Sequence, residues 1–427
     1  MSDYIFYFET GNGKAKTFNY KKNEFKTMFM TDVYKLKKRY FVFKSYNPTE
    51  DGLIKFAKDF FVWVDEIKNN DIFSFDYLKY ASHETACMDI FKKLCHGKYE
   101  DMEDIDGVEF EWIEKCNNAF LIYCKQGKYD CHGYDFSSHF PTILACESFE
   151  IPKCRGKEQT ITDISYNSLQ VGYYNVIISS NDERFNKVFA YSKNQVYTHT
   201  SLLFAFMCQK EGYDVNINLV QTANNAYLYG KGKKDNIMKG SSIFCKWYRF
   251  LFELKEKFPK NKLVKALTSQ LWGRLAQQNK LFKTDEEIAN EGLDVVLKYD
   301  SNHDYYIRNV TINKKGDDLC ELVNCKNPYK YTLSRIKPFL LAKSRYLTGK
   351  IAMAHIDDVI RIHTDNVTFN KQHDDVLAIL KTFPLTKEDK TTGLIEWRTP
   401  SCYKHHTNPK FTTKNFKDDV IDSDDEE

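Results

Sequence analysis

The stretch Gly-Tyr-Asp-Phe-Ser-Ser-His-Phe-Pro at residues 133–141 is the most informative part of the chain. Residues 129–135 have the pattern of a β-strand, which places Asp135 at a strand end. A serine-containing turn follows, and Pro141 suits the first turn of a helix. The stretch therefore predicts a strand, a turn and a helix, with one carboxylate at the end of the strand.

A second stretch, Ile-Arg-Ile-His-Thr-Asp-Asn-Val at residues 360–367, presents another carboxylate. Residues 359–363 and 367–369 are predicted strands, and residues 364–366 form a tight turn between them. The pattern predicts a β-hairpin with Asp365 at its tip. A helix that opens at Pro338 leads into this hairpin, with apolar residues at three- and four-residue steps.

Two carboxylates brought together from distant strands can hold two divalent cations about 3.5–4 Å apart. Nucleotidyl transfer uses such a pair, because one cation lowers the pKa of the attacking hydroxyl and the other holds the triphosphate. Asp135 and Asp365 are therefore the candidate catalytic residues and metal ligands. The expected cofactor is a pair of Mg²⁺ ions, with Mn²⁺ as an alternative. Each stretch alone is also compatible with an ordinary turn.

The composition indicates a large folded protein. A chain of 427 residues is long enough for two or three lobes. It is rich in Tyr (28) and Phe (32) and poor in Gly (18) and Pro (9), which argues against a disordered chain. No internal repeat is evident.

Charge is distributed unevenly along the sequence. The formal net charge is +3, but seven carboxylates lie between Asp418 and Glu427, so the remainder carries +10. Residues 231–265 contain eleven Lys or Arg against three acids. A basic segment with interspersed aromatic residues suits a polyphosphate or a nucleic-acid backbone. An ordinary solvated helix face is the alternative interpretation.

The cysteine pattern and the hydropathy indicate the cellular compartment in which the protein is expected. Twelve cysteines occur without a Cys-x-x-Cys pair, which is typical of reduced thiols in a cytosolic or nuclear protein. No run of about 18 apolar residues exists, and the first residues lack a signal-peptide pattern. We therefore expect a soluble intracellular protein, in the host cytoplasm or nucleus, with no membrane partner.

Other segments give coarser expectations. Residues 1–105 alternate short aromatic strands with amphipathic pieces, and the acidic cluster from Glu100 to Glu111 is interpreted as a hydrated linker. Residues 147–198 form a mixed β segment, with its clearest strand at 172–179. Residues 261–281 have helical spacing with leucines on one stripe. Four residues used below lie along that helix: Lys265, Ser269, Trp272 and Gly273.

The order of these elements resembles the palm and fingers of family B DNA polymerases, and it is most similar to the protein-primed branch found in viruses and linear plasmids. The resemblance covers roughly residues 110–405. It implies an α+β right-hand polymerase, with a palm of antiparallel sheet plus helices, helical fingers and a small thumb. The implied domains are an N-terminal region at 1–105 that can be a vestige of an exonuclease domain, palm at 106–200 with an inserted β segment, fingers at 201–275, palm continued at 276–385, a reduced thumb at 386–412, and a disordered acidic tail at 413–427.

The family's first motif is Asp, two residues, Ser-Leu-Tyr-Pro, and residues 135–141 are similar to it. The match implies that Asp135 binds both metals and that the carbonyl of Phe136 helps to hold the nucleotide's cation. Phe140 replaces the tyrosine that excludes a ribose 2′-hydroxyl. Nucleotide contacts are implied for Ser137, Ser138, His139 and Phe140.

The second motif, Lys, three residues, Asn-Ser, one residue, Tyr-Gly, resembles residues 265–273. Lys265 would neutralise the incoming phosphates, and Trp272 would support the nascent base pair. Ser269 replaces the asparagine and stays a candidate nucleotide contact, and Gly273 a candidate DNA contact. Lys255 lies near where the family places another triphosphate-binding lysine.

The third motif, Tyr, one residue, Asp-Thr-Asp-Ser, resembles residues 361–366. Asp365 matches the metal-binding acid, whereas His363 replaces the other acid. The resemblance makes His363, Thr364, Tyr403 and Lys404 candidate contacts to the primer. Glu9 is similar to part of an exonuclease motif, but Tyr7 replaces its aspartate, so proofreading is predicted to be absent.

The resemblance implies a DNA-directed DNA polymerase, with primer-template DNA and dNTPs as partners and with a terminal protein primer or a replication accessory protein as a further partner. The alternative is a polymerase-derived protein that binds nucleic acid without catalysis, which His363 and the Ser269-Gln270 pair favour. An RNA-making or RNA-templated polymerase is disfavoured by the aromatic residue at Phe140 and by the absence of a Tyr-x-Asp-Asp hairpin.

Overall fold

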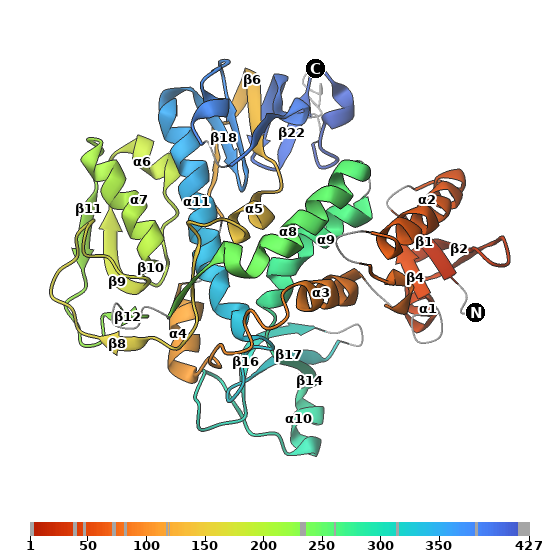
Figure 1. The fold of residues 1–427 in the computed structure, drawn as a ribbon, viewed down its shortest axis with the longest axis horizontal. Coiled ribbons are helices and arrows are strands. Elements are labelled where there is room, and N and C mark those ends of the chain that lie inside the picture. Colours follow the sequence, from red (N-terminus) through yellow and green to blue (C-terminus); the bar gives the residue numbers. More distant parts are fainter. Residues whose placement is uncertain are drawn as a thin grey trace, which may run out of the picture. The chain divides into compact units, whose positions relative to one another are not determined.

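The computed structural model describes residues 4–36, 41–45, 48–70, 74–80, 83–116, 118, 120–230, 236–259, 262–312, 316–380 and 383–416. The acidic tail expected to be disordered lies outside these residues from 417 onward. The chain divides into two compact units, one formed by Met1–Asp101 with Ser241–Leu275 and one by Met102–Gly240 with Ala276–Glu427 (Figure 1). This division separates residues 201–240 from 241–275, which the sequence grouped as fingers.

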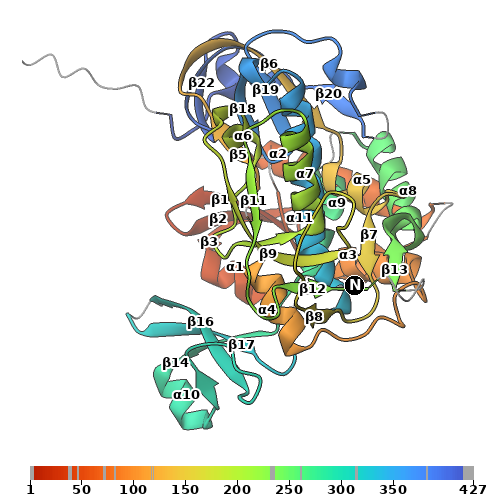
Figure 2. The ribbon, with the colours of Figure 1, turned by 90° about the vertical axis from the view of Figure 1, so that its left-hand side faces the viewer.

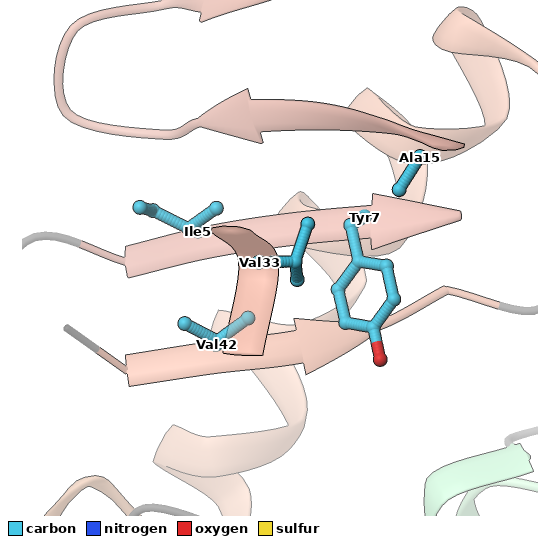
Figure 3. Packing of buried hydrophobic residues seen from close by; sticks show 5 residues of the cluster. All are labelled: Ile5, Tyr7, Ala15, Val33 and Val42. Carbon is cyan, nitrogen blue, oxygen red and sulfur yellow. The ribbon is translucent and has the colours of Figure 1, made fainter. Parts of the chain in front are cut away.

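The first unit contains a four-stranded sheet in the order β3-β2-β1-β4. The strands β1 (Tyr4–Gly11), β2 (Lys14–Asn19) and β3 (Glu24–Phe29) are antiparallel neighbours, whereas β4 (Phe41–Lys44) runs parallel to β1 after α1 (Met30–Leu36). Because side chains alternate along a strand, Ile5 and Tyr7 share one face of the sheet. There they pack with Ala15, Val33 and Val42 (Figure 3).

The opposite face of β1 packs against α2 (Glu50–Lys68). Phe6 of β1 makes an edge contact with Phe60, whose ring centroid lies 5.4 Å away. Thr49 caps the helix by accepting a hydrogen bond from the backbone N–H of Gly52 at 3.0 Å. Tyr7, which stands where the exonuclease motif has an aspartate, is thus a core residue on the other face.

Three helices complete the first unit: α3 (His83–Leu94), α8 (Gly240–Lys257) and α9 (Lys262–Leu275). Phe91 of α3 stacks on Phe244 of α8 at 5.3 Å. The predicted helix at 261–281 is correct in type but too long, since it ends at Leu275 and residues 280–284 form a strand. Pairing of that strand with a distant one outweighs the local helical pattern, which sequence spacing does not reveal.

The second unit is built on a seven-stranded sheet in which every pairing is antiparallel (Figure 2). Its helix α11 (Ile336–Ala354) packs against two central strands, β18 and β19. In order across the sheet, the strands are β22 (Cys402–His405), β21 (Gly393–Thr399), β6 (Gly127–Phe136), β19 (Asn366–Phe369), β18 (Val359–His363) and β5 (Ile122–Cys124), with β20 (Leu385–Lys387) also paired to β6. Residues 393–405, placed in a thumb by the sequence, are hydrogen-bonded to the same sheet.

Smaller sheets surround this one. The predicted strand at 172–179 is confirmed as β9 (Gly172–Ser179). It pairs in a sheet with β8 (Lys157–Gln159), β10 (Val196–Thr198), β11 (Asn216–Leu219) and β12 (Ala226–Leu228), next to α6 (Glu183–Val188) and α7 (His199–Lys210). The others are β7 (Glu150–Pro152) with β13 (Ile237–Lys239), and β14 (Lys280–Thr284), β15 (Val295–Val296), β16 (Tyr305–Ile312) and β17 (Asp318–Asn324) with α10 (Asp285–Glu291).

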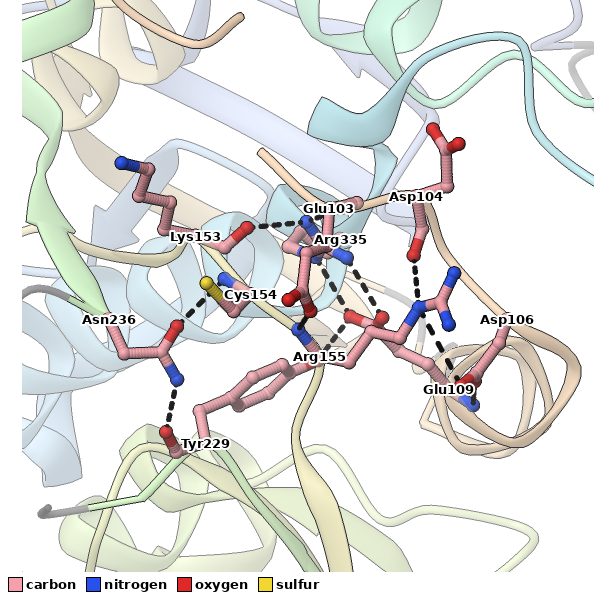
Figure 4. A network of polar contacts seen from close by, with 10 residues as sticks. All are labelled: Glu103, Asp104, Asp106, Glu109, Lys153, Cys154, Arg155, Tyr229, Asn236 and Arg335. Carbon is pink, nitrogen blue, oxygen red and sulfur yellow. Dashed lines mark hydrogen bonds and ion pairs between the residues drawn. The ribbon is translucent and has the colours of Figure 1, made fainter. Parts of the chain in front are cut away.

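A buried ion pair fixes α4 (Gly107–Lys115) inside the second unit (Figure 4). Arg335 donates from Nε and Nη2 to the two oxygens of Glu109 at 2.8 and 2.9 Å, and both side chains are fully buried. The hydroxyl of Tyr229 donates a further hydrogen bond to Glu109 at 2.8 Å. The expectation of a hydrated acidic linker is therefore wrong for Glu109, which is buried in a helix and paired with residues distant in sequence.

The secondary structure is thus α+β. Among the residues that the structure describes, no helix combines the length and the apolar character needed to cross a bilayer.

Candidate active site

Asp135 lies in the interior of the large sheet, close to the end of β6. It pairs with Asn366 of β19 on one side and with Thr386 of β20 on the other. Gly133, two residues earlier, passes so close to Thr391 that a Cβ atom there would lie 1.8 Å from the threonine Oγ1. The backbone around Asp135 is therefore held on both edges, and its half-buried side chain leaves the sheet from a fixed position.

The tip of the β18–β19 hairpin is fixed by hydrogen bonds from three other segments. Thr364 has a left-handed backbone with φ of +60°, its N–H donates to the carbonyl of Leu121 at 3.2 Å, and its carbonyl accepts from Thr348 Oγ1 of α11 at 2.9 Å. The carbonyl of Asp365 accepts from the N–H of Phe136 at 3.0 Å. The predicted hairpin with an acid at its tip is confirmed.

These hydrogen bonds bring Asp365, in the turn before β19, next to Asp135 near the end of the neighbouring strand β6. Directly paired residues have Cα atoms about 4.5–5.5 Å apart, and Asp365 is one residue from Asn366, the partner of Asp135. Since consecutive Cα atoms are 3.8 Å apart, the Cα atoms of Asp135 and Asp365 lie within roughly 9 Å of each other. Both side chains are half-buried.

A buried arginine that sequence reasoning did not select lies beside both acids. Arg361 is 7% exposed, it donates from Nη1 to Asn366 Oδ1 and from Nε to the carbonyl of Pro400, both at 2.7 Å, and its guanidinium lies 5.0 Å from the Trp397 ring centroid. Burial lowers its pKa below the usual range, whereas nearby acidic groups, Asp135 and Asp365 among them, raise it. The guanidinium stays protonated and favours the ionised form of both acids.

A charged residue in the middle of an apolar strand was the signal that could have identified Arg361. The run Val-Ile-Arg-Ile-His at residues 359–363 is buried except for its last residue. A buried charge is retained only when specific partners hold it.

His363 occupies the position of the missing acid. Its Nε2 lies 3.1 Å from Ser401 Oγ in the β21–β22 turn. Burial, and then the neighbouring Arg361, lower the pKa of His363 below its usual value of 6.5, so the imidazole is neutral at pH 7. This position therefore carries no negative charge, and it links the hairpin tip to the C-terminal hairpin.

Two further predicted residues lie on that C-terminal hairpin. Tyr403 pairs with Trp397, and their ring centroids are 4.6 Å apart. Since directly paired residues share a face, Tyr403 lies on the sheet face that carries Trp397 and the Arg361 guanidinium. Lys404 Nζ lies 6.0 Å from the ring of Phe416.

Several residues of the segment after Asp135 already make contacts within the protein. The N–H of Ser137 donates to the carbonyl of Pro384 at 3.0 Å, and Ser138 has a left-handed backbone with φ of +52°. His139 is 3% exposed, with Nε2 2.8 Å from Ser344 Oγ of α11, so only its backbone is placed to meet a ligand. Phe140 is half-buried, and its ring lies 6.0 Å from that of Phe120.

The residues of the second motif belong to the first unit. On α9, Lys265, Ser269 and Gly273 are exposed and Trp272 is half-buried, whereas Leu267 and Leu271 are buried on the opposite face. Lys255 is half-buried on α8. The structure thus joins the first and third motifs within one sheet and places the second motif along one helix of the other unit.

The donor set at the sheet fits Mg²⁺. Asp135 and Asp365 supply carboxylate oxygens, the ligands that Mg²⁺ prefers, and Mg²⁺ sites use one or two protein carboxylates together with substrate phosphates. The candidate residues Asp135, Asp365 and the Phe136 carbonyl are therefore chemically compatible with the two expected ions.

No protein-family profile and no curated protein matches the sequence. Among solved structures, the chain is similar to phi29 DNA polymerase complexed with primer-template DNA, at 11% identity and a TM-score of 0.55 over 94% of this chain and 87% of that one. It is also similar to phi29 DNA polymerase complexed with single-stranded DNA, at 11% identity and a TM-score of 0.52 over 93% and 74% of the two chains. At such low identity the likeness concerns the fold alone. The chain has a fold similar to that of a DNA polymerase.

Proposed function

We propose that this protein is a DNA-directed DNA polymerase that adds dNMPs to a primer 3′-hydroxyl by two-metal nucleotidyl transfer. The observation that carries the proposal is the placement of Asp135 on β6 beside Asp365 at the tip of the neighbouring hairpin, in a fold similar to a DNA polymerase. The motif resemblance points to the same two acids.

In this proposal Asp135, Asp365 and the Phe136 carbonyl hold the two Mg²⁺ ions. When bound, the ions lower the pKa of the primer hydroxyl and offset the charge of the triphosphate as the hydroxyl attacks the α-phosphate and pyrophosphate leaves. The positive charge of Arg361 is attracted to both acids. Because these groups are already fixed by the sheet, little reorganisation accompanies the reaction.

The remaining predicted residues position the substrates. Lys255 and Lys265 attract the triphosphate by charge, and the backbone of Ser138 and His139 adds donors to it. Phe140 excludes the ribose 2′-hydroxyl. The primer end is held by His363, Thr364, Tyr403 and Lys404, and the new base pair is supported by Ser269, Trp272 and Gly273. Priming from a protein hydroxyl is the version of this activity that the resemblance to the protein-primed branch favours.

Primer extension tests the proposal directly. The wild type, Asp135→Asn and Asp365→Asn are compared on a primed DNA template with dNTPs and Mg²⁺. Asp130→Asn is the matched control, because Asp130 is exposed on the same strand and alternation turns it to the opposite face. We expect extension by the wild type and the control and none by the other two variants. Extension by both active-site variants would refute the mechanism.

A second function, DNA binding without catalysis, is favoured by one observation. His363 stands where the polymerase motif has an acid. It contacts Ser401 and carries no negative charge at neutral pH. Under this alternative the wild type binds primer-template DNA with an affinity that falls as salt rises, yet incorporates nothing, even when a protein primer is supplied.

A further inference from the structure

Two histidines and two aspartates gather on the other side of the β6 strand from Asp135. His355 ends α11, Asp358 immediately precedes β18, and His373 and Asp375 follow β19. One potential ligand atom from each of His355, His373 and Asp375 lies within 4.8 Å of the other two. In the part of the chain that the structure describes, no other group of three or more His, Cys, Asp or Glu side chains meets this condition.

The contacts within the cluster match the spacing of ligands around one cation. Nε2 of His355 lies 2.9 and 3.0 Å from the two oxygens of Asp375, and Nε2 of His373 lies 3.1 Å from Asp358 Oδ2. Ligand bonds of about 2.0–2.1 Å in a tetrahedral zinc site place neighbouring ligand atoms about 3.3 Å apart. A cation would therefore fit between the atoms of these pairs if the two atoms of each pair moved slightly apart.

Hydrogen bonding alone leaves the cluster incompletely satisfied. Nε2 of His373 is buried and has no well-aligned hydrogen bond within the described residues, although Asp358 Oδ2 lies 3.1 Å away. A cation between the ring nitrogen and the carboxylate would bind to both.

The two imidazoles of the cluster are stacked on each other. The rings of His355 and His373 lie parallel, with centroids 3.6 Å apart and an interplanar angle of 7°. A single divalent cation between them would offset the charges of Asp358 and Asp375. To share it, the rings must tilt from parallel so that both Nε2 lone pairs point to one place.

We propose that His355, His373 and Asp375, with Asp358 as the fourth ligand, form a binding site for a divalent transition-metal ion of the Zn²⁺ type. Imidazole nitrogens favour such ions over Mg²⁺, which prefers oxygen ligands. Lys371 competes for this site, because its Nζ lies 3.0 Å from Asp358 Oδ1. The site is distinct from Asp135 and Asp365 and does not depend on polymerase activity.

The metal would lock the chain on both sides of the catalytic hairpin. His355 and Asp358 precede β18, and His373 and Asp375 follow β19, so one ion joins the two ends of the hairpin that carries Asp365. The backbone of His373 also holds Tyr134, whose hydroxyl donates to the His373 carbonyl at 2.9 Å and accepts from its N–H at 3.2 Å. The ion therefore supports β6 next to Asp135 from the opposite face.

Zinc titration of the full chain after chelator treatment tests the proposal, with calorimetry and metal analysis as readouts. We expect the wild type to bind one more Zn²⁺ per chain than His373→Gln or Asp375→Asn. The matched control is His303→Gln, because His303 Nδ1 lies 2.8 Å from Asp294 Oδ1 in an exposed pair with no second histidine stacked on it. Equal Zn²⁺ binding by the wild type and both site variants would assign the metal to the thiols and overturn the proposal.

A second experiment uses the wild type alone, so its outcome does not depend on whether a variant folds. Diethyl pyrocarbonate modifies accessible imidazoles, and mass spectrometry locates the modified residues. We expect Zn²⁺ to protect His355 while His303 continues to react. Unchanged modification of His355 in the presence of Zn²⁺ would contradict the site.

Discussion

The backbone N–H of Phe136 donates a hydrogen bond to the carbonyl oxygen of Asp365 at 3.0 Å, across two segments more than two hundred residues apart in sequence. This bond locks the end of β6 to the tip of the β18–β19 hairpin. It sets the relative position of the two candidate metal ligands through main-chain atoms. The geometry therefore survives replacement of either aspartate by asparagine, which is why those variants separate catalysis from folding.

Replacing Phe140 by alanine is predicted to relax sugar discrimination. The ring of Phe140 is half-buried beside Phe120, and an aromatic ring at this position excludes a 2′-hydroxyl by size. We expect the efficiency of rNTP relative to dNTP incorporation to rise about tenfold or more, equivalent to about 1.4 kcal/mol. Single-nucleotide extension measures the ratio. Phe120→Leu is the control, and an unchanged ratio in Phe140→Ala would remove Phe140 from this role.

Breaking the buried pair of Arg335 and Glu109 is predicted to destabilise the second unit strongly. Removing one partner of a buried ion pair leaves an uncompensated charge, at a cost of about 3–5 kcal/mol. We expect this loss in urea unfolding of Glu109→Gln. The control is Glu111→Gln, which breaks an exposed pair with Lys115 of 2.9 Å and should cost less than about 1 kcal/mol. Similar costs for the two variants would show that Glu109 is solvated.

Replacing Arg361 by methionine is predicted to lower stability by about 2–4 kcal/mol, since the change removes two hydrogen bonds from buried acceptors and a stacked guanidinium. Arg398→Met is a matched control, because Arg398 stacks on Phe416 at 4.2 Å but is only half-buried. Chemical unfolding compares the two. An effect of Arg361→Met no larger than that of the control would mean that the buried contacts of Arg361 do not stabilise the fold.

Acid is predicted to destabilise the fold through His139. Burial lowers its pKa from 6.5 to about 3, so between these values the unfolded chain binds a proton that the folded chain does not. Stability therefore falls as pH drops below 6.5, by about 2 kcal/mol at pH 5 for this one group. Thermal unfolding from pH 7 to 5 should show a steeper loss for the wild type than for His139→Gln. His199, whose pKa burial lowers to about 4, contributes equally to both proteins and cancels in the difference.

Local pattern was sufficient to predict the elements that carry the site. The β18–β19 hairpin, the strand that ends near Asp135 and the leucine stripe of α9 follow from periodicity over a few residues. The boundaries were less accurate, as the end of α9 shows, because a strand pairing elsewhere in the fold decides where that helix stops.

Long-range polar contacts could not be predicted in the same way. Glu109 and Arg335 are 226 residues apart, and nothing near either residue distinguishes a buried acid from a hydrated one. His363 was noted as a departure from a motif and Arg361 was not selected, and their partners Asn366, Pro400 and Ser401 become evident only when the two hairpins are paired with β6.

The pairing of β6 also constrains the order in which the protein can fold during synthesis. Its neighbours β19 and β21 are made more than two hundred residues later, so the strand that bears Asp135 leaves the ribosome with both edges unpaired. Such non-local pairing is slow, and unpaired strand edges invite association with other chains. The large sheet can therefore be completed only after translation has passed residue 405, and until then β6 presents edges with which other chains can pair.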